Sequence, residues 1–139
     1  MSEHRFYHPI EVRYGDIDPQ GHVNNVVYFT YMEQARAKYI ERLGLWKGTD
    51  FLDLGIILAE AHCRFLAPLR YGQPVEVGVS VTRIGNKSFE MTYTLRDASS
   101  QDEAAQGWTV QVAYDYRTGE SVPIPPVWRE AIASFEELS

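Results

Sequence analysis

The sequence predicts an α+β fold in which one long helix covers one face of a five-stranded antiparallel sheet. Three observations lead to this prediction. One segment near the N-terminus repeats its apolar residues at helical spacing, five segments alternate apolar and polar residues with period two, and the later alternating segments are joined by connections of hairpin length. The 139-residue chain contains no internal repeat and no linker, so we expect a single domain over residues 1–139.

The first strand is expected at residues 7–14, where Ile10, Val12 and Tyr14 share one face. A polar loop follows, and the long helix then begins near Asn25. The apolar stripe of this helix consists of Tyr28, Met32, Ala35, Tyr39 and Leu43. Gly44 comes directly after the stripe and marks the expected end of the helix, because glycine readily adopts the left-handed conformation that terminates helices.

Four further strands are expected at residues 57–65, 75–82, 89–95 and 108–116. In the first of these, one face should carry Ile57, Ala59, Ala61, Cys63 and Phe65. Gly85 and Asn86 form a hairpin turn signal, residues 97–106 are polar and predict a loop, and a short amphipathic helix is expected at residues 127–138. Such a sheet has open edges that a second copy would cover, so we expect a homodimer or homotetramer.

Composition narrows the range of functions. The net charge of −6 gives no general electrostatic help in binding nucleic acid or an anionic membrane. No segment reaches the roughly 18 apolar residues that span a bilayer, and residues 1–8 are polar without a signal-peptide pattern, so we expect a cytoplasmic protein. Cys63 is the single cysteine, which excludes an internal disulfide and a cysteine metal cluster, and no strong metal-ligand spacing is present.

The polar connector at residues 16–25 carries the chemistry of interest. Asp, Pro, Gly and Asn are ordinary loop residues, and Asn24 or Asn25 can cap the helix, so turn formation explains most of this composition. A second interpretation rests on Asp18, whose backbone is restricted by the following Pro19, and on Gly21, which permits close approach to a ligand. A carboxylate facing the free N–H groups of a helix N-terminus can perform acyl chemistry, because those groups hold a developing oxyanion while the carboxylate activates water or attacks directly.

Residues 12–25 read VRYGDIDPQGHVNN. Tyr28, Tyr31, Glu33, Ala35 and Arg36 follow at fixed spacing. This motif resembles that of the hotdog-fold acyl-CoA thioesterases, and more narrowly the 4-hydroxybenzoyl-CoA thioesterase branch. The order of elements agrees over nearly the whole chain. The resemblance implies a sheet wrapped around one helix, a dimer made by joining two sheets, active sites at the dimer interface, and no cofactor other than the coenzyme A portion of the substrate.

The resemblance also implies roles for single residues. Asp18 matches the catalytic carboxylate, Asn25 lies where a backbone N–H meets the thioester carbonyl, and Gly21 matches the loop glycine beside the thioester. Tyr28, Tyr31 and Met32 then lie near the acyl pocket. Some relatives carry histidine at the position of Asn25, so a mechanism that needs a base there is not expected in this chain.

Three other groups of residues are candidates for weaker roles. Asp16 is the competing carboxylate, for which we expect a loop hydrogen bond or a contact with Arg13. His22 could tune Asp18 or contact substrate, although most loop histidines are simply packed polar residues. The segment from Arg64 to Arg96 contains five basic and two acidic residues in an otherwise acidic chain. We therefore expect the phosphates of coenzyme A there, on Arg64, Arg70 and Lys87, although a solvated surface would have the same composition.

The sequence thus predicts hydrolysis of an acyl thioester to the free acid and thiol, with Asp18 as general base or nucleophile. Two alternatives remain open at this point. One is hydration or dehydration of an acyl thioester on the same fold, and the other is a binding protein without catalysis. The length and aromatic character of the acyl group, and the choice between coenzyme A and a carrier protein, are left open as well.

Overall fold

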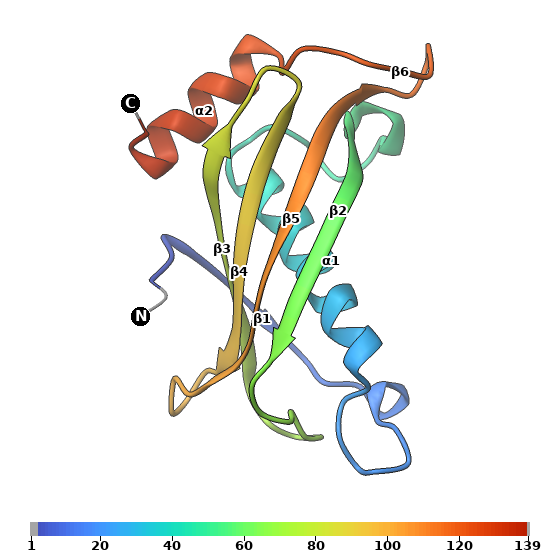
Figure 1. Cartoon of the computed structure of the whole chain (residues 1–139), viewed down its shortest axis with the longest axis vertical. Helices are drawn as coiled ribbons and strands as arrows, with labels where there is room; N and C mark the ends of the chain where they lie inside the picture. Colours follow the sequence, from blue (N-terminus) through green and yellow to red (C-terminus); the bar gives the residue numbers. More distant parts are fainter. Residues whose placement is uncertain (1–2, 139) are drawn as a thin grey trace.

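A curled antiparallel sheet wraps around the long helix α1 in the computed structural model, which describes residues 3–138 (Figure 1). The elements follow in the order β1 (Phe6–Ile10), α1 (Asn25–Arg42), β2 (Ile56–Phe65), β3 (Val75–Ile84), β4 (Ser88–Asp97), β5 (Glu103–Asp115), β6 (Glu120–Ser121) and α2 (Pro126–Glu136). Short 3-10 turns lie at Tyr14–Asp16 and Phe51–Asp53. The predicted fold class, one long helix on an antiparallel sheet with a short C-terminal helix, is confirmed.

The main strands lie in the order β1-β3-β4-β5-β2, and the two-residue strand β6 pairs with β5. Every pairing between these strands is antiparallel. The expectation of hairpin connections throughout is wrong at one place, because β2 pairs with β5 and the segment at residues 66–74 carries the chain to β3 instead of forming a hairpin. This crossing leaves β2 at an edge of the sheet, beside the N-terminal half of α1 (Figure 1).

Three predicted strand boundaries or faces are corrected by the backbone. β1 ends at Ile10, and β5 begins at Glu103 within the segment expected to be a loop. β2 contains a bulge between Leu58 and Glu60, so that Ile57 faces Val112 while Ala61 faces Thr109. Because Val112 and Thr109 are three residues apart on β5, their side chains lie on opposite faces, and Ile57 and Ala61 do not share a face.

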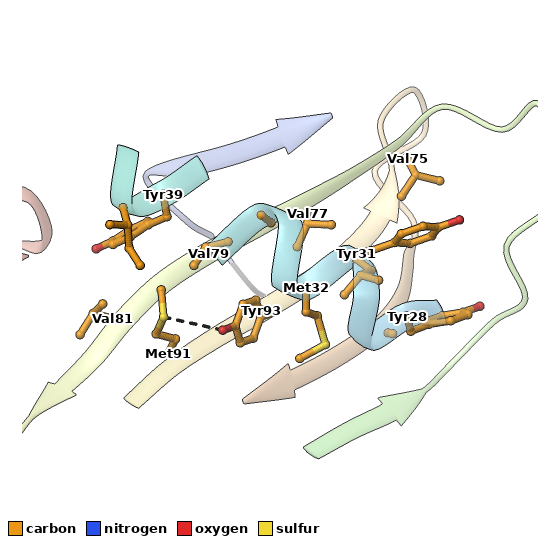
Figure 2. Packing of buried hydrophobic residues seen from close by; sticks show 14 of the residues in the cluster. Tyr28, Tyr31, Met32, Tyr39, Val75, Val77, Val79, Val81, Met91 and Tyr93 are labelled. Carbon is orange, nitrogen blue, oxygen red and sulfur yellow. Dashed lines mark hydrogen bonds between the residues drawn. The ribbon is translucent and has the colours of Figure 1, made fainter. Parts of the chain in front are cut away.

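The hydrophobic core lies between α1 and the inner face of β3 and β4. Figure 2 shows Met32 and Tyr39 of α1 among Val77, Val79 and Tyr93 of the sheet. α1 ends as expected, with Leu43 as its C-cap and Gly44 at φ +75°. Gly107 of β5 lets the helix approach closely, since a Cβ there would lie 2.6 Å from the carbonyl oxygen of His62 and 2.9 Å from Cε of Met32.

Candidate active site

The loop between β1 and α1 closes on itself around Asp18. The Asp18 N–H donates to the carbonyl of His22 at 2.8 Å, and the Gly21 N–H donates to the carbonyl of Asp18 at 2.9 Å. The Gln20 N–H donates to Oδ1 of Asp18 at 3.0 Å, as in an Asx turn. Gly21 has φ +82°, a conformation that favours glycine. These bonds hold the half-buried Asp18 carboxylate in one orientation and leave Oδ2 without a hydrogen bond among the described residues.

The N-terminus of α1 lies next to this loop. Asn24 is its N-cap, because its side-chain oxygen accepts from the Val26 N–H at 2.9 Å. The Asn24 N–H donates in turn to the carbonyl of Asp16, also at 2.9 Å, which ties the helix end to the loop. The N–H of Asn25 is the first of the helix and makes no hydrogen bond within residues 3–138, as expected for the orphan donors of a helix start.

A cavity of about 380 Å³ brings the two parts together. Its lining contains Asp18, His22 and Asn25 on one side and Tyr28 and Phe65 on the other. Leu66, Ala67 and Pro68 complete the wall. The sequence analysis missed this last segment, which comes from the crossing between β2 and β3. The side chains of this segment are exposed to solvent in the structure, and only the tertiary fold brings them next to the loop.

Tyr28 joins the crossing segment to α1. Its buried hydroxyl accepts from the Leu69 N–H at 3.1 Å and donates to the carbonyl of Ala67 at 3.2 Å, and its ring meets that of Phe65 edge to face. Burial raises the pKa of this hydroxyl above its usual value. The Val23 N–H adds a third tie by donating to the carbonyl of Leu69 at 2.8 Å. Tyr28 therefore lines the cavity and also holds its opposite wall in place.

Asp16 lies on the far side of the loop and has a different environment. It is 2% exposed. Its carboxylate accepts from the Tyr31 hydroxyl at 2.6 Å, from the Arg13 N–H at 2.9 Å and from the Arg13 guanidinium at 3.2 Å. Burial alone would raise the pKa of Asp16, but the hydrogen bonds from Tyr31 and Arg13 outweigh it, so the pKa lies below its usual value. The expected contact between Asp16 and Arg13 is confirmed.

The structure does not bring all the predicted site residues into one place. Tyr31 lines a separate cavity with Arg13, on the far side from Asp18. Burial and the Asp16 carboxylate raise the pKa of its hydroxyl far above the usual value. Met32 packs against Gly107 and lines a third cavity with Arg36.

The three predicted phosphate ligands are also dispersed. Arg64 lies on the outer face of the sheet, in a cavity with the stacked rings of His62 and Trp108. Arg70 is exposed on the crossing segment, near the loop that carries Asp18. Lys87 is exposed at the turn between β3 and β4, at the opposite end of the sheet (Figure 1).

Residues 3–138 contain no group of three or more His, Cys, Asp or Glu side chains placed to hold a metal ion. Among the helices described, none combines the length and apolar character needed to cross a membrane.

The model of the thioesterase-like superfamily matches residues 12–132. The chain belongs to this family. It has the hotdog fold and is a thioester hydrolase.

Two relatives illustrate the match. A 1,4-dihydroxy-2-naphthoyl-CoA hydrolase of Thermosynechococcus vestitus is 30% identical over 126 residues, which cover 84% of this chain and 83% of the relative. The crystal structure of a Thermus thermophilus thioesterase complexed with coenzyme A and zinc is 32% identical, with a TM-score of 0.82, and the match covers 94% of this chain and 93% of that one. Both similarities extend over most of this chain.

Proposed function

We propose that this protein hydrolyses an acyl-CoA, or a related acyl thioester, with Asp18 as general base or nucleophile and the Asn25 N–H as the group that polarises the thioester carbonyl. One observation carries the proposal: Asp18 and Asn25 line the same cavity, and the Asn25 N–H makes no hydrogen bond among the described residues. The naphthoyl-CoA hydrolase and the coenzyme A complex among the relatives support coenzyme A as the thiol.

The chemistry follows from the two groups. The Asn25 N–H donates to the carbonyl oxygen, and this interaction strengthens as negative charge develops on that oxygen. As a general base, Asp18 takes a proton from water, which adds to the carbonyl and releases the thiolate. As a nucleophile, Asp18 adds to the carbonyl itself, the C–S bond breaks and the thiolate leaves, and water then hydrolyses the resulting anhydride to the free acid and the Asp18 carboxylate. His22 lines the same cavity, and we expect it to contact substrate.

The proposed active unit is a homo-oligomer. The cavity beside Asp18 opens along the junction between α1 and β2, and β2 is an edge strand without a partner on its outer side among residues 3–138. Large apolar side chains are exposed along this edge, including Phe29, Leu58 and Phe65. An exposed apolar edge strand is a surface that a second copy can cover by extending the sheet. The partner would then close the cavity from the open side.

The decisive experiment replaces Asp18 by asparagine and assays a panel of acyl-CoAs with a thiol-detecting reagent. Loss of a general base or nucleophile should lower kcat by about 10² to 10⁴-fold without unfolding the protein. Glu11→Gln is the matched control, because Glu11 is exposed in the segment between β1 and α1 that also carries Asp18, and the substitution removes the same charge. Near-normal turnover in Asp18→Asn would refute the assignment. Hydration of an enoyl-CoA by the wild type, without thiol release, would favour the hydratase alternative on the same cavity.

A further inference from the structure

A buried polar chain runs from α1 through the sheet, away from the Asp18 cavity. The Arg36 guanidinium donates from Nη1 to the hydroxyl of Tyr93 at 3.2 Å, and this hydroxyl lies 2.6 Å from Oγ1 of Thr109. Nε2 of Gln111 donates to the same Oγ1 at 3.1 Å. Tyr93, Thr109 and Gln111 are all at most 1% exposed. Burying four polar side chains in a hydrophobic interior costs free energy, and hydrogen bonds must offset that cost.

Hydrogen bonding within this chain is incomplete at both ends. Oε1 of Gln111 is fully buried and has no partner among the described residues. At the other end, the Arg36 side chain is 11% exposed, and its ion pair with Glu33 is long, 4.0 Å from Nη2 to Oε2. A guanidinium has five N–H donors, and most of those on Arg36 have no close acceptor within residues 3–138. Unlike the Gln111 oxygen, these Arg36 donors are not sealed off from the surface, so a ligand can reach them.

The unfilled donors border a cavity of about 180 Å³ between α1 and β2. Arg36 and Thr109 contribute its polar wall. Its apolar wall consists of Val26, Phe29, Met32, Leu58 and Ala61. The two cavities share no lining residue, but both lie between α1 and β2: Asn25 and Phe65 line the Asp18 cavity, and Val26 and Ala61 line this one.

We propose that this second cavity binds the far end of the acyl group, and that Arg36 and Thr109 select acyl groups carrying a hydroxyl or keto oxygen at that end. The inference rests on the proposed hydrolysis at Asp18. Asn25 and Arg36 are separated by eleven residues of helix, or about 16 Å between Cα atoms at 1.5 Å per residue. An acyl group whose carbonyl meets the Asn25 N–H reaches the guanidinium only if it is longer than a single ring with its substituent. Val26, Phe29 and Met32 line the apolar path between the two points.

The preferred oxygen is uncharged. Glu33 lies on the rim of the cavity and already places a carboxylate near the guanidinium. A second carboxylate on the acyl group would meet this negative charge, whereas a hydroxyl or keto oxygen accepts from Arg36 without repulsion. Thr109 lines the same wall and can donate its own hydroxyl proton to the ligand, since its oxygen is the point where Tyr93 and Gln111 meet.

The test compares two substrates of equal length, decanoyl-CoA and ω-hydroxydecanoyl-CoA. The wild type should show a higher kcat/KM for the hydroxylated substrate. Arg36→Met should reduce this preference by about tenfold or more, since a hydrogen bond to a charged group is lost. Thr109→Val keeps the shape of the side chain and should reduce it less. Both changes should act on KM, because the contact is distant from the reacting carbonyl and holds ground and transition states alike.

Arg42→Met is the control, because Arg42 is an exposed cation on the last turn of the same helix. It should leave the preference unchanged.

If Arg36→Met fails to fold, Thr109→Val carries the test alone. Equal kcat/KM for the two substrates in the wild type, or an unchanged preference in the folded variants, would overturn the inference while leaving hydrolysis intact. A loss of oligomer in Arg36→Met with unchanged preference would overturn it too, because the guanidinium would then serve the second copy. Absence of any acyl-CoA hydrolysis by the wild type would refute the proposed function, and this inference with it.

Discussion

Asp16 and Asp18 are two residues apart in the same loop and have opposite surroundings. Asp16 is buried and its carboxylate accepts three hydrogen bonds, two from Arg13 and one from Tyr31. Asp18 is half-buried, accepts one hydrogen bond from the backbone of Gln20, and borders a cavity. The first carboxylate therefore holds the loop together and fixes it against α1, whereas the second retains lone pairs for a substrate or a water molecule.

This difference separates what we call the anchoring half of the loop, Arg13 and Asp16 with Tyr31 of α1, from its proposed reactive half, Asp18 and His22 with Asn25 of α1. A carboxylate whose lone pairs are occupied is stabilised as a structural group and is poorly available as a base. Substitutions in the reactive half should therefore change kcat with little effect on unfolding. Substitutions in the anchoring half should change the free energy of unfolding first.

The largest expected effect in the reactive half, besides that of Asp18 itself, comes from removing one backbone N–H. Asn25→Pro deletes this donor at the first position of α1, where proline is tolerated. The preceding Asn24 has φ −59° and ψ 137°, which a residue before proline readily adopts. We expect kcat to fall by about 10² to 10³-fold, as for loss of one oxyanion donor.

Asn25→Ala is the control for this variant, because it changes the side chain and keeps the N–H. It should retain most of the activity. Equal turnover in the proline and alanine variants, with matching melting temperatures, would show that the carbonyl is polarised elsewhere.

In the anchoring half, Asp16→Asn should destabilise the fold by about 1–3 kcal/mol, because an amide cannot accept all three hydrogen bonds without placing its own NH₂ against a donor. Denaturant unfolding measures this loss directly. The kcat of the folded fraction should stay within a few-fold of the wild type. A fall in kcat as large as that of Asp18→Asn, with unchanged stability, would reverse the assignment of the two carboxylates.

The pH dependence of stability provides an independent measurement of the same anchor. The pKa of Asp16 is lowered in the folded state, so its ionised form stabilises the protein at pH values above the unfolded pKa of about 3.9. This stabilisation is lost as the pH falls through that value towards the lower folded pKa. The difference in unfolding free energy between wild type and Asp16→Asn should therefore be largest near neutral pH and shrink in acid. A constant difference down to pH 3 would show that Asp16 does not titrate as proposed.

The long helix and the loop before it could be predicted from the sequence better than their surroundings. The spacing of Tyr28, Met32 and Tyr39 indicated α1, and the polar run before it indicated the turn that presents Asp18, because both are local patterns. Non-local packing was beyond its reach. Nothing near Leu66 or Pro68 indicates that the crossing segment forms the opposite wall, and nothing near Arg36 indicates that its partner is Tyr93. The bulge in β2 also left no signal, so the face of Ile57 was predicted wrongly.

Tyr28 connects the reactive half to that opposite wall and should have a smaller effect than either aspartate. Tyr28→Phe removes the hydrogen bonds to Leu69 and Ala67 while keeping the ring. The loss should be about 1–2 kcal/mol of stability, because two hydrogen bonds with a usual net value of about 1 kcal/mol each are removed. A looser wall should raise KM for acyl-CoA more than it lowers kcat, because the wall contacts the substrate at a distance from the reacting atoms. Thermal melting and steady-state kinetics on the same preparation would check both, and a fall in kcat alone would assign the hydroxyl a direct role.

The smallest expected effects are those of replacing the two exposed cations Arg70 and Lys87. Arg70 is on the crossing segment, whose residues 66–68 line the Asp18 cavity, while Lys87 is at the turn between β3 and β4, at the opposite end of the sheet. An exposed contact to a phosphate contributes roughly 0.2–1 kcal/mol, so Arg70→Gln should raise KM for acyl-CoA by at most about fivefold and leave kcat unchanged. Added salt should produce the same change in the wild type, because it screens exposed charges. The KM for an acyl-pantetheine thioester, which lacks the nucleotide, should change neither with Arg70→Gln nor with salt.

Lys87→Gln should raise KM only if a second copy brings the far end of its sheet to this cavity. An effect of Lys87→Gln equal to that of Arg70→Gln would therefore place the phosphates between two protomers. Equal responses of acyl-CoA and acyl-pantetheine to salt would instead make these residues ordinary solvated surface.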